Sequence, residues 1–443
     1  MPLTFQVAIF TTPIYHARMS GDGGRGVDAR ARGGESSGLP RGPAAVIGTG
    51  LLVTSLGWPA LLARLPLGLF LKNRLHLGAA DVAAFWAVGT VAWYAKPLAG
   101  LLCDGVPLFG SRRRAYLIAG GIAAAALWGA LALAPPTRGA LLALVVAINV
   151  ALVIVSAAVG GLLVAEGQRH AATGRFSGLR LGIDGAVALV AGPLGGWLAT
   201  RALGWTAAAG AAVALPLAPL AWAFLREPPA PRRRLAELLS LRSRAPWLVL
   251  AFVFVAYLPP GFQTALLFHQ QDTLGLDART MGYLQLLAGA GALIGAAIYV
   301  RVCRRFTLRA LLVGGIVLNV VGTVIYVRYD TLAAAQVISL VGAVLGTLAV
   351  LPYYDLAARA VPSGGESFGY ALILSAQNIA SFAVSEPLGA YLYGLPAIGF
   401  TGVVWINTAA TAAVLLLVPL LPAALLVRRE GEGEGDGERE RAT

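Results

Sequence analysis

Residues Trp93 to Leu117 read WYAKPLAGLLCDGVPLFGSRRRAYL: an apolar stretch, an acidic turn, three consecutive arginines and a second apolar stretch. An arginine-rich loop between two hydrophobic spans is typical of the cytoplasmic face of a membrane, because cationic loops resist translocation. Asp104 and the arginines would lie where two helices enter the bilayer, at a boundary of intermediate polarity where opposite charges can pair. The stretch therefore predicts a membrane protein with a charged gate at this face.

The composition of the whole chain supports the same class. Hydrophobic residues make up 58% of the 443 residues and charged residues only 12%, whereas soluble domains carry about 25% charged residues. A bilayer core needs helices of about 20 apolar residues, and the chain contains many such runs. Closed barrels are excluded, because their strands are about 10 residues long and alternate apolar with polar residues. The predicted fold is an all-α integral membrane protein.

The formal net charge of +13 does not indicate a nucleic-acid partner. The basic residues of the chain are almost all arginines, and they lie in alternate loops, as membrane topology requires. The two cysteines, Cys103 and Cys303, fall at predicted helix ends in separate halves and support neither a disulfide framework nor a metal site. We expect no metal and no cofactor.

Twelve apolar spans divide the chain. They are expected near 44–71, 81–103, 115–134, 139–165, 176–200, 204–225, 246–270, 280–300, 309–327, 332–360, 366–394 and 399–427. The predicted organisation is a disordered cytoplasmic tail (1–43), a six-helix half (44–225), a cytoplasmic linker (226–245), a second six-helix half (246–427) and a charged tail (428–443).

Loop charge predicts the orientation of these spans. With the amino terminus inside, the cytoplasmic loops hold sixteen arginines, against six basic residues in the opposite loops. Both termini are therefore expected in the cytoplasm. We expect a multi-pass protein of a bacterial-type inner (plasma) membrane, surrounded by lipid and monomeric.

Two short patterns recur in the second half at nearly the same displacement. GPLGGWL at 192–198 returns as PLGAYL at 387–392, displaced by 194 residues. Gly100 and Asp104 match Gly295 and Tyr299 at a displacement of 195, each pair followed by arginines. Two parallel six-helix halves are the organisation of the major facilitator superfamily.

The loop motif allows a finer comparison. Residues 96–117 follow the pattern KPLxGLxxDxxPLFGxRRRxYL, which resembles the folate-biopterin transporter family of that superfamily. The stretch from Leu351 to Asn378, LPYYDLAARAVPSGGESFGYALILSAQN, is similar to the tenth and eleventh helices of the same family. The resemblance covers about Gly48 to Tyr393 and implies a secondary transporter, with a folate or pterin as substrate. One departure is that the family's two helix-4 aspartates are absent before Val164-Ala165-Glu166, with Ser156 and Gly160 near their expected places.

Charged and polar residues inside apolar spans are candidates for the substrate site, because a charge at mid-membrane costs at least about 2.5 kcal/mol. Asp184 lies deep in the fifth span with Arg180 one turn before it, and Asn378 is its repeat equivalent. Arg64, between two prolines in the first span, could bind a substrate carboxylate, and Gln263 could donate into the cavity. Alternatively, Arg180 and Asp184 only neutralise each other, and Arg64 extends outward or pairs with an acid.

Other charged residues suit proton coupling and gating. The candidates for proton coupling are Asp184, Glu386 and Glu166, and Glu386 could instead be an arginine's partner. A contact that forms in only one access state would bias the equilibrium between two states. The predicted gating residues are Lys96, Asp104, Arg112, Arg113, Arg114, Asp355 and Arg359, the last two as a latch between helices.

The predicted function is secondary active transport of a small organic solute by alternating access, with proton coupling as an added hypothesis. Nucleotide-binding loops, metal-ligand clusters and nucleophile–base pairs are not found in the sequence, so an enzyme is not expected. Two alternatives stay open. One is a transporter or exporter of another aromatic or anionic metabolite, and the other is a non-transporting membrane scaffold or assembly factor.

Overall fold

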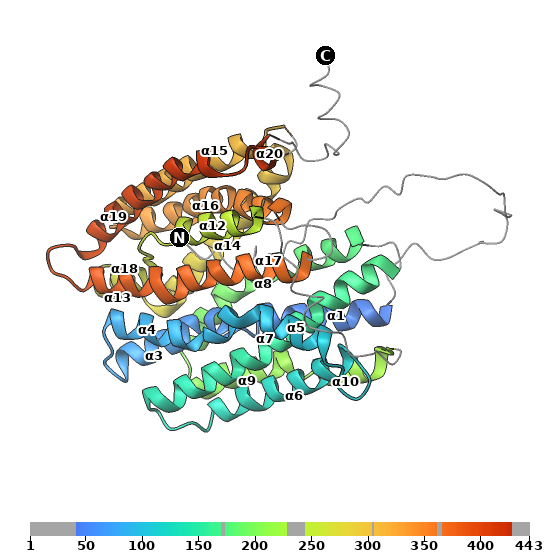
Figure 1. The fold of residues 1–443 in the computed structure, drawn as a ribbon. Helices are drawn as coiled ribbons and strands as arrows, with labels where there is room; N and C mark the ends of the chain where they lie inside the picture. Colours follow the sequence, from blue (N-terminus) through green and yellow to red (C-terminus); the bar gives the residue numbers. More distant parts are fainter. Residues whose placement is uncertain (1–40, 170–172, 228–243, 304, 361–365, 428–443) are drawn as a thin grey trace, which may run out of the picture.

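The computed structural model describes all residues except 1–40, 170–172, 228–243, 304, 361–365 and 428–443. The described residues form twelve helical passes that lie side by side (Figure 1). In chain order these passes are α1–α3 (Arg41–Ser55, Pro59–Leu62, Arg64–Asn73), α4–α5 (Ala79–Gly89, Lys96–Gly105), α6 (Arg114–Leu131), α7 (Arg138–Arg169), α8 (Thr173–Ala199), α9–α10 (Leu203–Ala214, Leu217–Phe224), α12–α13 (Ala245–Ala256, Gln263–Asp272), α14 (Ala278–Val302), α15 (Leu308–Val324), α16 (Leu332–Ala360), α17–α18 (Glu366–Asn378, Glu386–Tyr393) and α19–α20 (Gly399–Ala413, Ala423–Leu426).

Each predicted apolar span corresponds to one pass, so the twelve-helix prediction is confirmed. Both predicted tails and most of the predicted linker lie outside the described residues, although α1 already begins at Arg41, inside the segment assigned to the first tail. Eight stretches in the described part of the chain are long and apolar enough to cross a membrane. The other four passes, 1, 2, 7 and 11, are interrupted near the middle.

Proline accounts for much of this interruption, because it lacks an N–H and clashes with the preceding turn. Pass 1 breaks between α1 and α2 at Trp58, directly before Pro59. Pass 2 contains a 3-10 segment, Val91–Ala95, and pass 7 is open between Ala256 and Gln263, across Pro259 and Pro260. Pass 11 contains a π-helix that links α17 to α18. Irregular backbone inside a membrane protein is tolerated where it is buried in protein or lines a cavity, so these four passes are the ones to search for a site.

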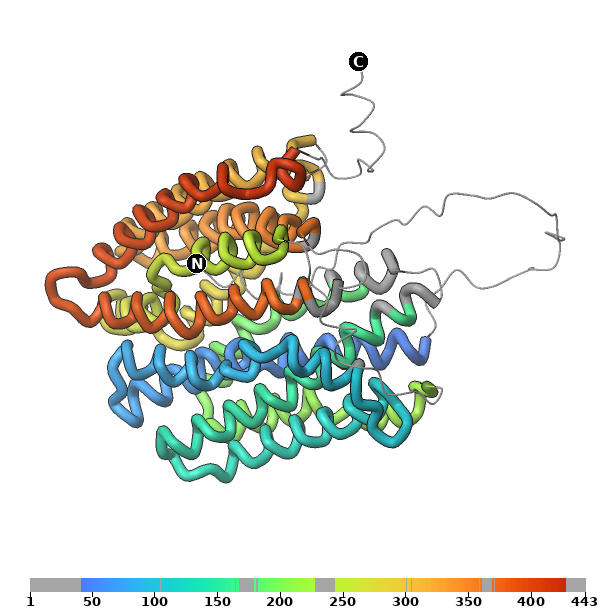
Figure 2. Tube along the Cα trace, in the orientation of Figure 1, coloured from blue at the N-terminus to red at the C-terminus, as the bar shows by residue number. Residues whose placement is uncertain are grey.

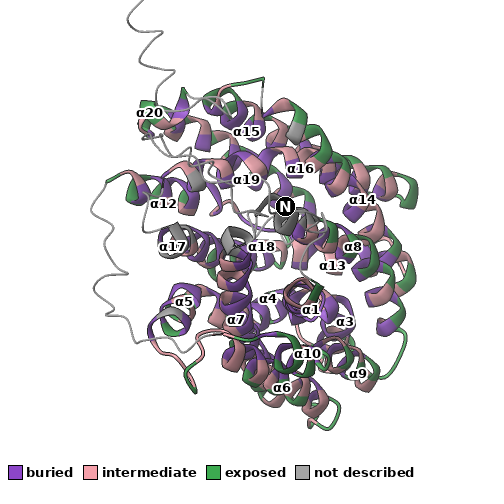
Figure 3. Cartoon of the chain, turned by 90° about the vertical axis from the view of Figure 1, so that its right-hand side faces the viewer, coloured by how far each residue is buried: buried purple, intermediate pink, exposed green. Residues whose placement is uncertain are grey.

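The two halves form separate layers with separate apolar cores. In Figure 2 the blue-to-green first half lies below the yellow-to-red second half. The largest buried cluster comes from residues 46–225, joined by three side chains of the second half, Phe268, Phe382 and Ala390. A second cluster lies wholly between Val249 and Leu426. Viewed along the helices, exposed residues gather on the outer rim and buried ones inside (Figure 3). Exposed apolar side chains such as Trp205, Trp222 and Leu416 suit contact with lipid.

The two ends of the bundle differ, and we name them by one residue each. The Lys72 end carries the loops at 74–78 and 273–277, and the Arg113 end carries the loop at 106–113. Toward the Lys72 end, α8 of the first half touches α14 of the second through glycines. A Cβ at Gly192 would lie 2.6 Å from the carbonyl oxygen of Gly282, and one at Gly196 would lie 2.8 Å from that of Ala278. Only glycine allows these backbones to approach so closely.

Candidate functional site

Glu386 caps the second segment of the broken seventh pass. It is 9% exposed and stands at the first position of α18. Its Oε1 accepts the backbone N–H of Gln263 at 3.2 Å, and its Oε2 accepts the backbone N–H and the hydroxyl of Thr264, each at 3.2 Å. A helix N-terminus attracts anions, because its first N–H groups lack partners within the helix. The break in pass 7 thus creates the site that holds this carboxylate.

Arg64 reaches the same carboxylate from the first half. One terminal guanidinium nitrogen lies 3.8 Å from Glu386 Oε2 and donates to the Thr264 hydroxyl at 3.1 Å. The guanidinium also lies over the Trp86 ring, 5.1 Å from its centroid. Arg64, Thr264 and Glu386 therefore form a polar node that joins passes 1, 7 and 11 across the interface of the halves.

Ser385, Asn407 and two glycines fasten passes 7, 11 and 12 around this node. The Ser385 hydroxyl donates to the carbonyl of Pro259 at 2.6 Å, and Asn407 donates to that of Pro260 at 2.8 Å. A Cβ at Gly389 would lie 1.5 Å from the carbonyl oxygen of Gly261. The open segment of pass 7 is consequently fixed to pass 11 and pass 12 rather than loose.

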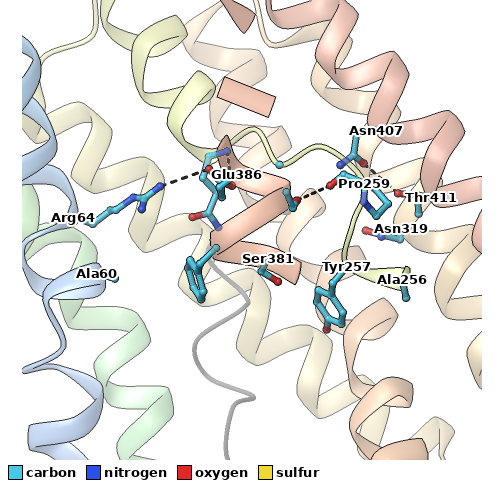
Figure 4. Close-up of a pocket in the computed structure, with 14 residues that line it drawn as sticks. Ala60, Arg64, Ala256, Tyr257, Pro259, Asn319, Ser381, Glu386, Asn407 and Thr411 are labelled. Atoms are coloured by element: carbon cyan, nitrogen blue, oxygen red, sulfur yellow. Dashed lines mark hydrogen bonds and ion pairs between the residues drawn. The ribbon is translucent and has the colours of Figure 1, made fainter. Parts of the chain in front are cut away.

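A pocket that includes several polar side chains adjoins the node (Figure 4). Most of its lining comes from passes 7, 9, 11 and 12 of the second half, and Ala60 and Arg64 contribute from the first. It is lined by Ala60, Arg64, Ala256, Tyr257, Pro259, Gly261, Gln263, Asn319, Ser381, Phe382, Ser385, Glu386, Asn407 and Thr411.

The structure brings some of the predicted binding residues together and separates others. Arg64 and Gln263 both line the pocket, and Arg64 has the acidic partner that was one of its alternatives. Asp184 lies elsewhere, 3.6 Å from Arg180 and 2.9 Å from the hydroxyl of Ser55. Asn378, at the end of α17, is buried but does not line the pocket. The contacts described for Asp184 match the mutual neutralisation that was its alternative.

The proton-coupling candidates occupy different surroundings. Glu386 belongs to the node, and Asp184 to the pair with Arg180. Glu166 is 8% exposed near the Arg113 end of α7. Glu386 contacts both halves, through Arg64 of the first and Gln263 of the second.

The predicted gate residues at the Arg113 end make their described contacts within one half. Arg113 and Arg114 donate their backbone N–H groups to Glu227 Oε2 at 3.0 and 3.1 Å. A Cβ at Gly161 of α7 would meet the Arg113 side chain at 2.7 Å. Arg112 lies in the loop directly before them, and the side chain of Asp104 is outside the described part of the structure.

Lys96 and the pair Asp355 and Arg359, the other predicted gate residues, also make their described contacts close by in the chain. Lys96 is buried, with its ammonium 5.3 Å from the centroid of the Trp93 ring on the same pass. Arg359 binds Asp355 at 2.8 and 2.9 Å, four residues away on α16. These two hydrogen bonds lie within one helix, so the latch between helices stays a prediction.

A charged contact between the halves lies at the Lys72 end. Lys72 of α3 forms an ion pair with Asp272 of α13 and donates to Gln271 Oε1 at 2.9 Å. Gln271 in turn donates to Asn73 Oδ1 at 3.3 Å, and the Lys72 ammonium lies 4.6 Å from the centroid of the Phe268 ring. Sequence reasoning had counted Lys72 only as a loop charge.

Sequence reasoning also missed Asn149, a fully buried residue in the middle of α7. Its Oδ1 accepts the indole N–H of Trp58 at 2.8 Å and that of Trp93 at 2.7 Å. Its Nδ2 donates to the carbonyls of Gly89 at 2.8 Å and Val145 at 2.9 Å. Asn149 thus forms hydrogen bonds to the interrupted segments of both pass 1 and pass 2.

Comparison with known structures identifies the class. The D-xylose-proton symporter matches with a TM-score of 0.66 at 14% identity, over 87% of this chain and 98% of that chain. The nucleoside transporter NupG matches with a TM-score of 0.65 at 11% identity, over 86% of this chain and 98% of that chain. At these identities the likeness shows the fold, which is that of the major facilitator superfamily. Twelve passes in two halves, with a charged node buried between them, define a secondary transporter of small solutes.

The chain belongs to the BT1 family, whose model matches residues 57–229 and 235–439. A relative from Synechocystis sp. (strain ATCC 27184 / PCC 6803 / Kazusa), named folate-biopterin transporter, is 29% identical over 362 residues. That match covers 75% of this chain and 72% of the relative. The predicted family resemblance is thereby confirmed.

Proposed function

We propose that this protein transports a folate- or pterin-like anion together with a proton, and that Arg64 and Glu386 form the coupling site. The observation that carries the proposal is the Arg64–Glu386 pair, 3.8 Å apart between the two halves and beside the pocket. The relative named folate-biopterin transporter supports the choice of cargo.

The coupling follows from competition for one guanidinium. An ionised Glu386 attracts Arg64, whereas a protonated Glu386 no longer does, so proton binding frees Arg64 for a substrate carboxylate. A guanidinium can hold such a carboxylate with two parallel hydrogen bonds. The proton also cancels the negative charge that would otherwise be left in the site. Binding of anion and proton is then mutually favourable, as linkage requires.

The Lys72 end is assigned to the outer face, and the Arg113 end with both termini to the cytoplasm of a bacterial-type inner membrane. Loop charge supports this orientation, because the arginines gather at the Arg113 end. In this orientation the Lys72–Asp272 pair and the glycine contact of α8 with α14 close the outer side. Release of these contacts, with closure at the Arg113 end, would complete alternating access in a monomer.

The test is uptake of labelled folate and labelled pterin by proteoliposomes, with and without an inward proton gradient. The wild type should accumulate one of them when the gradient is applied. Glu386→Gln should abolish the response to the gradient while substrate binding persists. Arg64→Lys should raise the KM at least about tenfold, because an ammonium cannot replace the planar fork.

A matched control and a competition assay complete the test. Gly129→Ala lies on α6 where a Cβ would meet no atom within 4 Å, so it should behave as the wild type. Competition by unrelated aromatic acids separates a pterin site from a general aromatic-anion site. If neither folate nor pterin is taken up at any proton gradient, the proposal that a folate or pterin is the substrate is overturned.

A further inference from the structure

The pocket beside the node contains several amide and hydroxyl groups, and most of its lining comes from the second half. Asn319 on α15 and Asn407 and Thr411 on α19 line one side of it, and Ser381 on the π-helix of pass 11 lines another. Thr411 donates to Asn407 Oδ1 at 3.2 Å. Amides and hydroxyls in a membrane interior require hydrogen-bond partners, since each unpaired group costs several kcal/mol.

Two of these groups have no protein partner among the described residues. Asn319 is 6% exposed, and no hydrogen bond of its side chain is found in the described part of the chain. The Oγ of Ser381 is buried and likewise without a described partner. An amide alone offers two donors and one carbonyl acceptor. Both side chains border the pocket, so a molecule inside it could satisfy them.

The size of the pocket fits water. Its volume is about 50 Å³, enough for a few waters, because one needs about 10–15 Å³ of such space. Water also matches the mixture of donors and acceptors in the lining, and ordered water usually makes about three hydrogen bonds.

Within the pocket, Glu386 lies between Arg64 and the side that is lined by Asn319, Asn407 and Thr411. Figure 4 shows Arg64 on one side of the carboxylate and the Asn319, Asn407 and Thr411 group on the other. Arg64 is the one charged group within ion-pair distance of Glu386 in the described structure, and Thr264, Gln263 and Ser385 around it are neutral. A proton arriving through water would reach the carboxylate without crossing the place where a substrate anion meets Arg64.

We propose that this pocket holds a short chain of ordered water molecules through which protons reach and leave Glu386. The proposal rests on the proposed proton coupling for its role, but the water itself is independent of any cargo. An excess proton enters the chain from bulk water; each water accepts one proton from behind and donates one ahead, and the last water donates to a carboxylate oxygen of Glu386, so every water is neutral again after the transfer. The first half makes a contrast, because Asn149 there has protein partners for both its oxygen and its nitrogen.

The presence of water is tested on the purified protein by X-ray radiolytic footprinting. Hydroxyl radicals formed from bound water should modify Tyr257, which lines the pocket and is 3% exposed. The matched control is Tyr326, which is 1% exposed and does not line the pocket. Asn319→Leu should reduce modification of Tyr257 and leave Tyr326 unchanged. Equal modification of the two tyrosines in the wild type would overturn the proposal, whatever the cargo.

The role in coupling is tested by comparing two transport modes of Asn319→Leu. Uptake driven by a proton gradient should fall at least about tenfold, whereas substrate exchange at equal pH should stay within about twofold of the wild type. Thr323→Val, a buried position of the same helix outside the pocket, is the control and should change neither mode. A parallel loss of both modes, or of neither, would overturn the proton path. If the wild-type protein shows no uptake driven by a proton gradient, both the proton path and the proposed proton coupling are overturned. The footprinting experiment would still show whether water occupies the pocket.

Discussion

Replacement of Asn149 by alanine should destabilise the first half more than its small change in size suggests. The substitution removes the shared acceptor of the Trp58 and Trp93 indoles and the donor to the Gly89 carbonyl. Hydrogen bonds between membrane helices contribute about 0.6 kcal/mol on average and up to about 1.7 kcal/mol each. Loss of three such bonds therefore predicts a cost of about 2 to 5 kcal/mol.

The cost can be measured as the free energy of unfolding of the purified protein in mixed micelles titrated with SDS. Asn149→Asp keeps an acceptor for both indoles but puts a carboxyl oxygen against the Gly89 and Val145 carbonyl oxygens, and an ionised carboxylate inside the membrane costs at least about 2.5 kcal/mol, so it should be no milder than alanine. Ser156→Ala is the matched control, seven residues further along the same helix, where the buried hydroxyl has no described partner. Its expected effect is within about 0.5 kcal/mol.

A double-mutant cycle isolates the bond to Trp58. Asn149→Ala and Trp58→Phe should cost less together than the sum of their separate costs, because both remove the same hydrogen bond. The reasoning is refuted if Asn149→Ala costs less than about 1 kcal/mol, or if Ser156→Ala is equally costly.

Two further predictions concern passes 7 and 11 and the Lys72 end. Gly389→Ala would place a Cβ 1.5 Å from a pass 7 carbonyl oxygen, so the yield of folded protein in size-exclusion chromatography should collapse, whereas Gly129→Ala should match the wild type. Normal yield of Gly389→Ala would show that the two backbones can separate freely. Lys72→Ala should loosen the outer closure and speed modification of a Ser381→Cys variant by an impermeant thiol reagent by up to about fivefold, since a partly exposed pair contributes at most about 1 kcal/mol. The charge-swapped pair Lys72→Asp with Asp272→Lys should restore the slow rate, and no change in Lys72→Ala would contradict a latch.

The fold was predictable from the sequence, because twenty-residue apolar runs and loop arginines report directly on a membrane's thickness and sidedness. The breaks of passes 1 and 7 follow from prolines that are visible in the chain, such as Pro59 and the pair Pro259 and Pro260. The helical passes therefore agree with the predicted spans, with differences at their ends.

The site was only partly predictable. Arg64 and Glu386 were both recognised as charges in apolar spans, but no local pattern reports which helices meet, so their pairing needed the structure. Asn149 was missed because a single amide in a long apolar helix adds no charge to the helix and does not alter the spacing of its apolar residues. Lys72 was missed as a latch because its partner is defined only after the two halves pack together.

The glycine contact between α8 and α14 bears on two questions: whether the two halves can assemble as separate polypeptides, and how a two-half protein can evolve by duplication. The halves meet there largely through main chain, at Gly192, Gly196 and Gly282 and again at Gly289, where a Cβ would lie 2.2 Å from the carbonyl oxygen of Ala188. Two halves made as separate polypeptides should therefore find each other without the linker, and a duplicated ancestral half could join its sister by the same contact. Such an origin leaves the remaining side chains free to diverge, so that one half can specialise in a dry, fixed scaffold and the other in a hydrated polar pocket.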